Sequence, residues 1–103
     1  MDKPTITTID GKTHEMINLT GRTYRVIAEF EKNAPQIEDV DFIERHAALV
    51  AELFDVTQDD VLDMPLDDIL PASHAARSFA YAFTWLKFKE IQKNVVEDKE
   101  QSA

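Results

Sequence analysis

The chain has 103 residues, of which 44% are hydrophobic and 30% charged, a size and composition typical of one globular domain. It has no cysteine and no apolar run of membrane-spanning length, which excludes disulfides, thiolate metal sites and a membrane span, and its amino terminus lacks the apolar core of a signal peptide. The net charge of −9 disfavours nucleic-acid binding, because a phosphate-binding surface needs lysine and arginine. We therefore expect a single cytoplasmic domain over residues 1–103.

The first element that the sequence predicts is a β-hairpin over residues 5–17. β-branched residues dominate its first half, and Asp10-Gly11 is the dipeptide favoured in a two-residue type I′ turn. That turn would place Ile9 opposite Lys12, and it explains Gly11 by a positive φ rather than by a ligand. Because an isolated hairpin is marginally stable, we expect it to pack against helices.

Two amphipathic helices should follow the hairpin. Thr20 is the expected N-cap of the first, which ends near Asn33, and Asp39 or Asp41 caps the second, which runs to about Phe54. The expected inward residues are Tyr24, Ile27, Ala28 and Phe30 in the first helix and Val40, Ile43, Ala47, Val50, Ala51 and Phe54 in the second.

A short third helix and a long last helix complete the predicted elements. Thr57 can cap the short helix. Pro65 and Pro71 each suit the first turn of a helix and interrupt one that runs through them. We therefore expect a single helical turn between the two prolines, followed by a separate long helix from Pro71 to about Gln92.

The predicted fold class is mostly α (α+β): an N-terminal β-hairpin packed on a bundle of about four helices, the last one long. The hairpin covers residues 5–17, the helical region residues 20–93, and the polar residues 94–103 form a disordered tail. The chain contains no internal repeat and no low-complexity segment.

The last long helix carries two apolar stripes. The first consists of Ala72, Ala75, Ala76, Phe79, Phe83 and Leu86. Tyr81, Trp85 and Phe88, at i, i+4 and i+7, form the second on the opposite side. A surface helix of a small monomer normally has one such stripe. Either the hairpin or the first helix covers the second stripe, or these three aromatics are partner-binding residues for self-association or for an apolar client.

The middle of the chain is strongly acidic. Between Glu38 and Asp68, eleven acidic residues accompany the single Arg45, a balance of −10. The simplest interpretation is a solvated face that maintains solubility. An alternative is a DNA-mimic inhibitor of a nucleic-acid enzyme, although the carboxylates are scattered among predicted caps and turns. A further alternative is a small helical oligomerisation module without a client.

No catalytic, cofactor or metal site is expected. His14, His46 and His74 lie on different elements, with no partner spaced to join them as metal ligands. The acids of the middle lack the residue order and the glycine of a calcium-binding EF-hand loop. No nucleophile elbow, P-loop or dinucleotide fingerprint is present. The sequence therefore gives no basis for an enzyme.

The order of elements carries a resemblance to a known family. It rests on an opening strand pair, a capped helix, and a threonine with paired acids ahead of a long helix, which here read ITTIDGKTHEM, IERHAALVAELFD and VTQDDVLDMPLDDIL. Over roughly Ile6 to Lys93 the chain resembles the small tail assembly chaperones of long-tailed bacteriophages and prophages, especially those of Gram-positive hosts. It departs from their pattern at Pro65, where a glycine is expected, and in the aromatic density of its last helix.

The resemblance implies a function. Proteins of that family coat the hydrophobic tape-measure protein in the cytoplasm of the bacterial host, keep it soluble, and help recruit tail-tube subunits. A domain with a second apolar stripe can bind an apolar helical client, and an acidic middle keeps such a complex soluble. The expected function is therefore that of a tail assembly chaperone whose partners are the tape-measure and tail-tube proteins.

Overall fold

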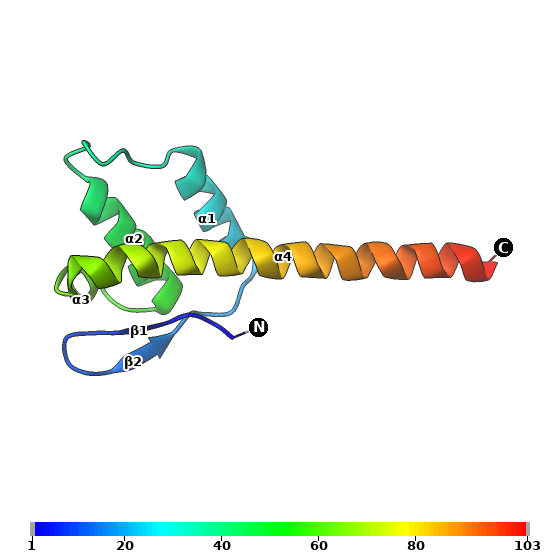
Figure 1. Ribbon diagram of the computed structural model, residues 1–103, viewed down its shortest axis with the longest axis horizontal. Helices are drawn as coiled ribbons and strands as arrows, with labels where there is room; N and C mark the ends of the chain where they lie inside the picture. The colour runs from blue at the N-terminus through cyan, green and yellow to red at the C-terminus, as the bar shows by residue number, and fades with distance from the viewer. Residues whose placement is uncertain (1, 103) are drawn as a thin grey trace.

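The computed structural model describes residues 2–102, with side chains described over residues 2–94 (Figure 1). Its elements are β1 (Thr5–Thr7), β2 (Thr13–Glu15), α1 (Gly21–Lys32), α2 (Phe42–Phe54), α3 (Gln58–Leu62) and α4 (Leu66–Ser102). The predicted class, mostly α with one N-terminal hairpin and a long last helix, is confirmed. The predicted disordered tail, 94–103, falls almost entirely outside the residues whose side chains are described.

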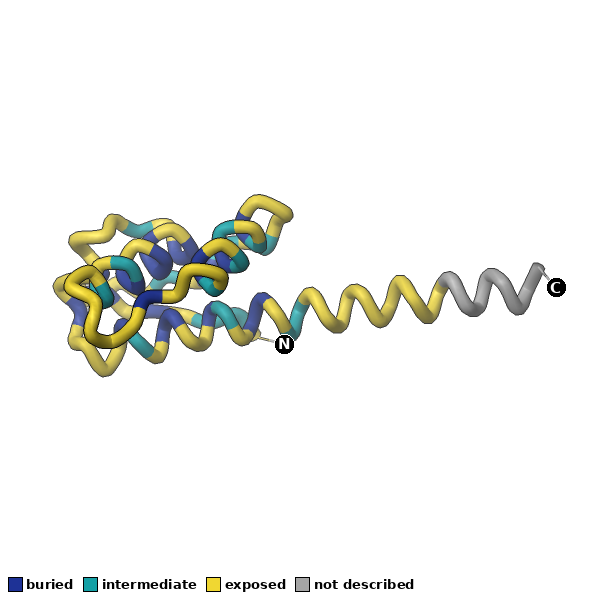
Figure 2. The backbone as a smooth tube through the Cα atoms, turned by 90° about the horizontal axis from the view of Figure 1, so that it is seen from above, coloured by how far each residue is buried: buried dark blue, intermediate teal, exposed yellow. Residues whose placement is uncertain are grey.

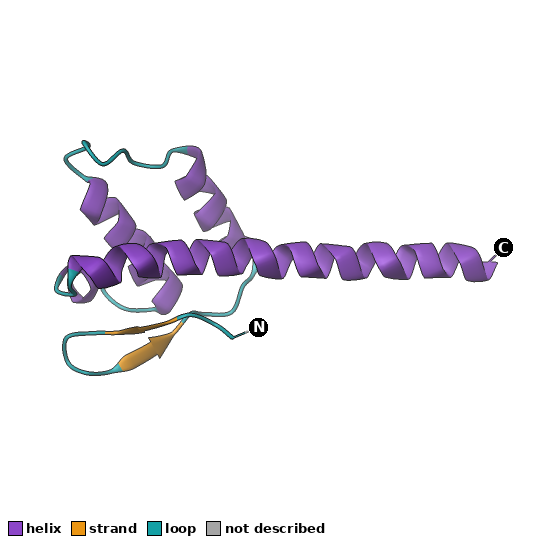
Figure 3. Cartoon of the chain, in the orientation of Figure 1, coloured by secondary structure: helices purple, strands orange, loops and turns teal. Residues whose placement is uncertain are grey.

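Helix α4 is the axis of the molecule. The hairpin, α2 and α3 gather around its first half, and α1 lies beside its middle (Figure 3). Beyond that point α4 continues alone, which makes the molecule elongated, with extents of 59 × 30 × 20 Å. We call residues 2–83 the head and residues 84–94 of α4 the arm.

The hairpin turn differs from the predicted one. β1 and β2 pair antiparallel, and the amide of Thr8 donates to the carbonyl of Lys12 at 2.9 Å, so the loop contains three residues instead of two. Gly11 has a positive φ of 82°, as predicted, but Asp10 does not, and a type I′ turn needs positive φ at both central residues. Ile9 therefore lies in the loop, where it is exposed, and not opposite Lys12.

The hairpin is joined to the helices through one face. Ile6 and Met16 are buried in the common core. The amide of Ile17 donates to the carbonyl of Leu53 at 2.9 Å, which links the segment that follows β2 to the last turn of α2. This attachment provides the helical support that a two-stranded hairpin requires.

The threonine caps form as predicted, whereas the aspartate cap does not. Thr20 and Thr23 form a capping box on α1, and Thr57 and Asp60 form another on α3. Asp41 occupies the N-cap position of α2, but its side chain makes no capping hydrogen bond.

The predicted break at Pro71 is wrong, because α4 runs through it. The helix begins after Pro65, whose carbonyl accepts from the amides of Asp68 at 2.9 Å and Ile69 at 3.1 Å. Ile69 and Ala72, on either side of Pro71, are both buried in the core. A proline in a helix removes one backbone hydrogen bond and crowds one carbonyl. Continuous burial of this face outweighs that cost.

The core lies where α2 crosses the first half of α4, and α1, α3 and the hairpin close it. Its most deeply buried large side chains are Met16, Ile27, Val50, Leu53, Phe54, Val61 and Ile69. Most predicted inward residues are buried or half-buried. Val40 is fully exposed instead, because it precedes the first turn of α2. On the first stripe of α4, Ala75 and Leu86 are exposed, while Phe83 is half-buried.

One buried polar pair lies inside this core. His46 Nδ1 and Ser73 Oγ share a hydrogen bond of 2.8 Å between α2 and α4. The imidazole also packs edge-on against the rings of Phe30 and Phe42. Burial is the main cause that lowers the pKa of His46 below its usual 6.5, and the nearby arginine Arg77 adds to it. The fold therefore favours a neutral imidazole.

This pair predicts a pH dependence of stability. Because the pKa of His46 is lowered in the folded state, the unfolded chain binds a proton that the folded chain resists. The free energy of unfolding should be at its full value above pH 6.5 and should fall as the pH drops from 6.5 through the lower folded pKa. Urea titrations across this range test it, with His46→Gln as comparison. A variant that loses as much stability as the wild type over the same range contradicts the assignment.

Within the part of the chain that the structure describes, no helix combines the length and the apolar character that crossing a bilayer requires. Helix α4 has the length, but acidic residues occupy its first turn and charged residues recur through its second half.

Candidate partner-binding site

The arm is a helix without tertiary cover. Figure 2 shows that burial along α4 ends at the boundary between head and arm, beyond which every described residue is exposed. Large hydrophobic side chains are exposed on it nonetheless: Trp85 is 57% exposed, Leu86 50%, Phe88 51% and Ile91 61%. Water-exposed apolar residues clustered in this way mark an interaction surface more often than isolated ones do.

The three residues proposed from the sequence lie together on one face. The rings of Trp85 and Phe88 stack with centroids 6.4 Å apart and an interplanar angle of 26°. Tyr81, at the base of the arm, meets the ring of Tyr24 in α1 edge-on at 5.9 Å. We call Tyr81, Trp85 and Phe88 the aromatic face. Its residues are brought together as the i, i+4, i+7 spacing predicts.

The sequence left open whether the hairpin or the first helix covers this stripe. The hairpin lies elsewhere, against the first turns of α4 (Figure 1). Helix α1 reaches Tyr81 and leaves it 38% exposed. The covered arrangement is therefore wrong for Trp85 and Phe88 and holds in part for Tyr81.

Helix α1 is held against α4 by an ion pair next to the aromatic face. The guanidinium of Arg77 lies 3.0 Å from the carboxylate of Glu31, and its Nε–H donates to the carbonyl of Ser73 at 3.1 Å. Partial burial, followed by the charge of Glu31 and the neighbouring Tyr24, raises the pKa of Tyr81. The phenol thus stays neutral, and it offers an O–H donor at the edge of the apolar surface.

Lysines border the aromatic face. The ammonium of Lys89 lies 5.3 Å from the centroid of the Trp85 ring. Lys87 forms a 3.5 Å ion pair with Glu90 and lies 5.6 Å from the ring of Phe83. With three lysines and one glutamate the arm has a charge of +2, whereas the head has a charge of −9. The surface is therefore an apolar stripe with a cationic border on a strongly acidic protein.

Two exposed residues of the arm were not proposed as binding residues from the sequence. Leu86 continues the first stripe, which the periodicity assigns to the core, but it lies one turn beyond the last contact with the head. Ile91 stands between Glu90 and Gln92, three residues after Phe88, so it adjoins the aromatic face. Only the position at which the head ends distinguishes such residues from core residues, and periodicity does not show that position.

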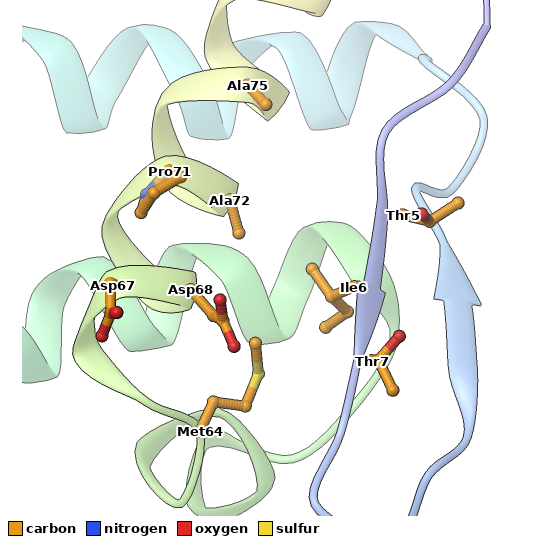
Figure 4. Close-up of a pocket in the computed structure, with 9 residues that line it drawn as sticks. All are labelled: Thr5, Ile6, Thr7, Met64, Asp67, Asp68, Pro71, Ala72 and Ala75. Carbon is orange, nitrogen blue, oxygen red and sulfur yellow. The ribbon is translucent and has the colours of Figure 1, made fainter.

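A pocket of about 350 Å³ lies on the head between β1 and the start of α4 (Figure 4). It is lined by Thr5, Ile6, Thr7, Met64, Asp67, Asp68, Pro71, Ala72 and Ala75. Apolar groups make up most of its wall, and two carboxylates lie at the turn that begins α4. Across the described residues, no three histidine or acidic side chains are placed to hold a metal ion. The pocket has no nucleophile paired with a base, so it presents no constellation for catalysis.

The aromatic face is therefore the stronger candidate, because it is apolar and exposed and lies where α4 leaves the core. A helical or extended apolar partner can lie along such a face. No protein-family model, no curated protein and no solved structure matches this chain.

Proposed function

We propose that this protein is an assembly chaperone that holds an apolar helical client against the aromatic face of its arm. By the resemblance of its sequence, the client is the tape-measure protein of a long-tailed phage, bound in the host cytoplasm while tail-tube subunits are recruited. The observation that carries the proposal is the exposure of Trp85 and Phe88 on the arm, the part of α4 in which every described residue is exposed.

The energetics favour such a role. Burying an exposed aromatic side chain contributes roughly 1.5–3 kcal/mol, so two aromatics and part of Tyr81 can hold a client helix with useful affinity. A helical client would meet the face through its own apolar positions at i, i+3, i+4 and i+7. The acidic head stays in water and keeps the complex soluble by charge repulsion.

The alternative of a DNA mimic receives less support from the carboxylates. A mimic needs them free and spaced like phosphates along one face. Several instead serve the fold: Asp39 accepts from the amide of Gln36 at 2.8 Å, and Asp60 accepts from the amide of Thr57 at 3.3 Å. These acids are explained by turns and caps without a nucleic-acid-binding target.

The proposal predicts a variant that separates binding from folding. Trp85→Ser should leave a co-expressed tape-measure protein from the same phage largely insoluble, because it removes the largest apolar surface of the face. Its own melting temperature should hardly change, since surface substitutions usually alter stability by less than about 0.5 kcal/mol. The soluble fraction of the client and the thermal melt of the variant measure the two effects.

Leu86→Ser is the matched control. Leu86 is 50% exposed, close to the 57% of Trp85, and lies on the same arm, but it belongs to the first stripe, away from the aromatic face. The control should keep the client soluble. Equal client solubility with the wild type and with Trp85→Ser, or the absence of a tape-measure gene beside the gene for this protein, contradicts the proposal.

A further inference from the structure

The aromatic face is part of a longer line of residues along α4. Steps of four and three residues alternate along this line, which is the spacing of a coiled-coil seam. Its members are Asp67, Pro71, His74, Ser78, Tyr81, Trp85, Phe88 and Gln92, and all eight are exposed. We call this line the seam. It is polar along the head and aromatic where it enters the arm, so one helix presents an exposed seam of more than three heptads, which α1 touches at Tyr81.

We propose that the seam pairs with the seam of a second copy of this chain, and that the two helices run antiparallel. The charges of head and arm favour a second copy as the partner of the seam, and they favour an antiparallel direction for the two helices. A parallel pair would place two heads of −9 side by side and bring together the lysines of the two arms. An antiparallel pair separates the heads and lays each arm of +2 along the acidic head of the other copy.

The spacing allows several antiparallel registers, and the aromatic residues select among them. With the two-fold axis midway between Tyr81 and Trp85, Tyr81 of each copy lies opposite Trp85 of the other, and Gln92 lies opposite His74. An axis between Trp85 and Phe88 also matches the alternating steps, but it shortens the overlap of each arm with the acidic head. An axis between Ser78 and Tyr81 lengthens that overlap, but it places no residue of the aromatic face opposite another.

The pairing extends the proposed function, and it rests on that function in one respect: the client and the second copy would compete for the same surface. The client and the second copy both need the aromatic face, so the paired form keeps the face out of water until a client displaces the second copy. The Lys89 ammonium beside Trp85 lies at the edge of the seam in either complex.

The test exploits the absence of cysteine from the chain. His74→Cys and Gln92→Cys introduce single thiols at exposed seam positions without touching an aromatic residue. Under mild oxidation an equal mixture of the two variants should form the mixed disulfide, whereas Gln92→Cys alone should form almost none. A parallel pair gives the reverse, because each seam residue then meets its own counterpart, and this result overturns the proposal.

Molar mass measured on the chain alone completes the test. The wild type should sediment as a dimer, and Trp85→Glu should lower its association constant at least about tenfold. Leu86→Glu adds the same charge at an exposed position of the arm off the seam and should leave the dimer intact. A monomeric wild type, or a dimer without the mixed disulfide, overturns the inference. Since no client is present, these outcomes are independent of the solubility assay for the proposed function.

Discussion

Replacing Phe54 with alanine should lower the free energy of unfolding by about 3–5 kcal/mol. Phe54 ends α2, is 2% exposed, and lies in the core formed by α2 and the first half of α4. The change removes most of a large side chain from a site enclosed by several elements, so a cavity remains. Since small domains are stable by only about 5–15 kcal/mol, this loss is a large part of the total, and the midpoint of denaturation should fall clearly. Urea denaturation followed by circular dichroism measures the loss.

Phe88→Ala is the matched control for this prediction. The same atoms are removed, but from a side chain that is 51% exposed on the arm. Its midpoint of denaturation should shift much less than that of Phe54→Ala when both are measured at a concentration where the chain is monomeric. Similar midpoints for the two variants would show that the core has been assigned to the wrong half of the molecule.

Replacing Pro71 with alanine should stabilise the domain by roughly 1–3 kcal/mol. Pro71 lies inside α4, where a proline costs about 3 kcal/mol relative to alanine through a lost hydrogen bond and a crowded carbonyl. Part of the gain is offset, because proline also restricts the unfolded chain by about 0.4–1 kcal/mol. The melting temperature should rise by several degrees.

Pro65→Ala provides the comparison, since Pro65 precedes the first residue of α4 and its missing amide lies outside the helical ladder. We expect that variant to melt close to the wild type. If Pro71→Ala is destabilised instead, the helix gains nothing from a regular backbone at that position, and the explanation of its continuity given above is wrong.

Local chemistry explains why much of the fold could be predicted from the sequence. Thr20 and Thr57 lie where capping boxes form, and a threonine that satisfies its own helix terminus needs no information from the rest of the chain. β-branched residues and a glycine predict the hairpin, but they do not determine the length of its loop. A two-residue and a three-residue loop both accept Gly11 at positive φ, and packing of Ile6 in the core selects the register that leaves three.

The break predicted at Pro71 failed for a related reason. Helix propensity is a local preference of a few kcal/mol, whereas burial of Ile69 and Ala72 depends on α2, which lies elsewhere in the sequence. The sequence could not show that both residues face the same core. The tertiary contribution therefore exceeded the local one at this position.

The sequence predicts which residues make up the candidate site, but it does not predict whether they are exposed. The spacing of Tyr81, Trp85 and Phe88 places them on one face of any helix. Whether another element covers that face depends on where α1 crosses α4, and it crosses at Tyr81. For the same reason Leu86, on the core stripe, proved to be exposed one turn beyond the head.

The division of α4 between head and arm means that one helix contains backbone amides with two different rates of hydrogen exchange. Amides around Ala76 and Ala80 are packed in the core and should exchange only when the domain opens as a whole. Amides of residues 84–94 have no tertiary packing, so they should exchange through local opening of the helix. A bound partner should slow exchange in the arm without changing it in the head. A single helix would therefore report the stability of the domain at one end and the occupancy of its surface at the other.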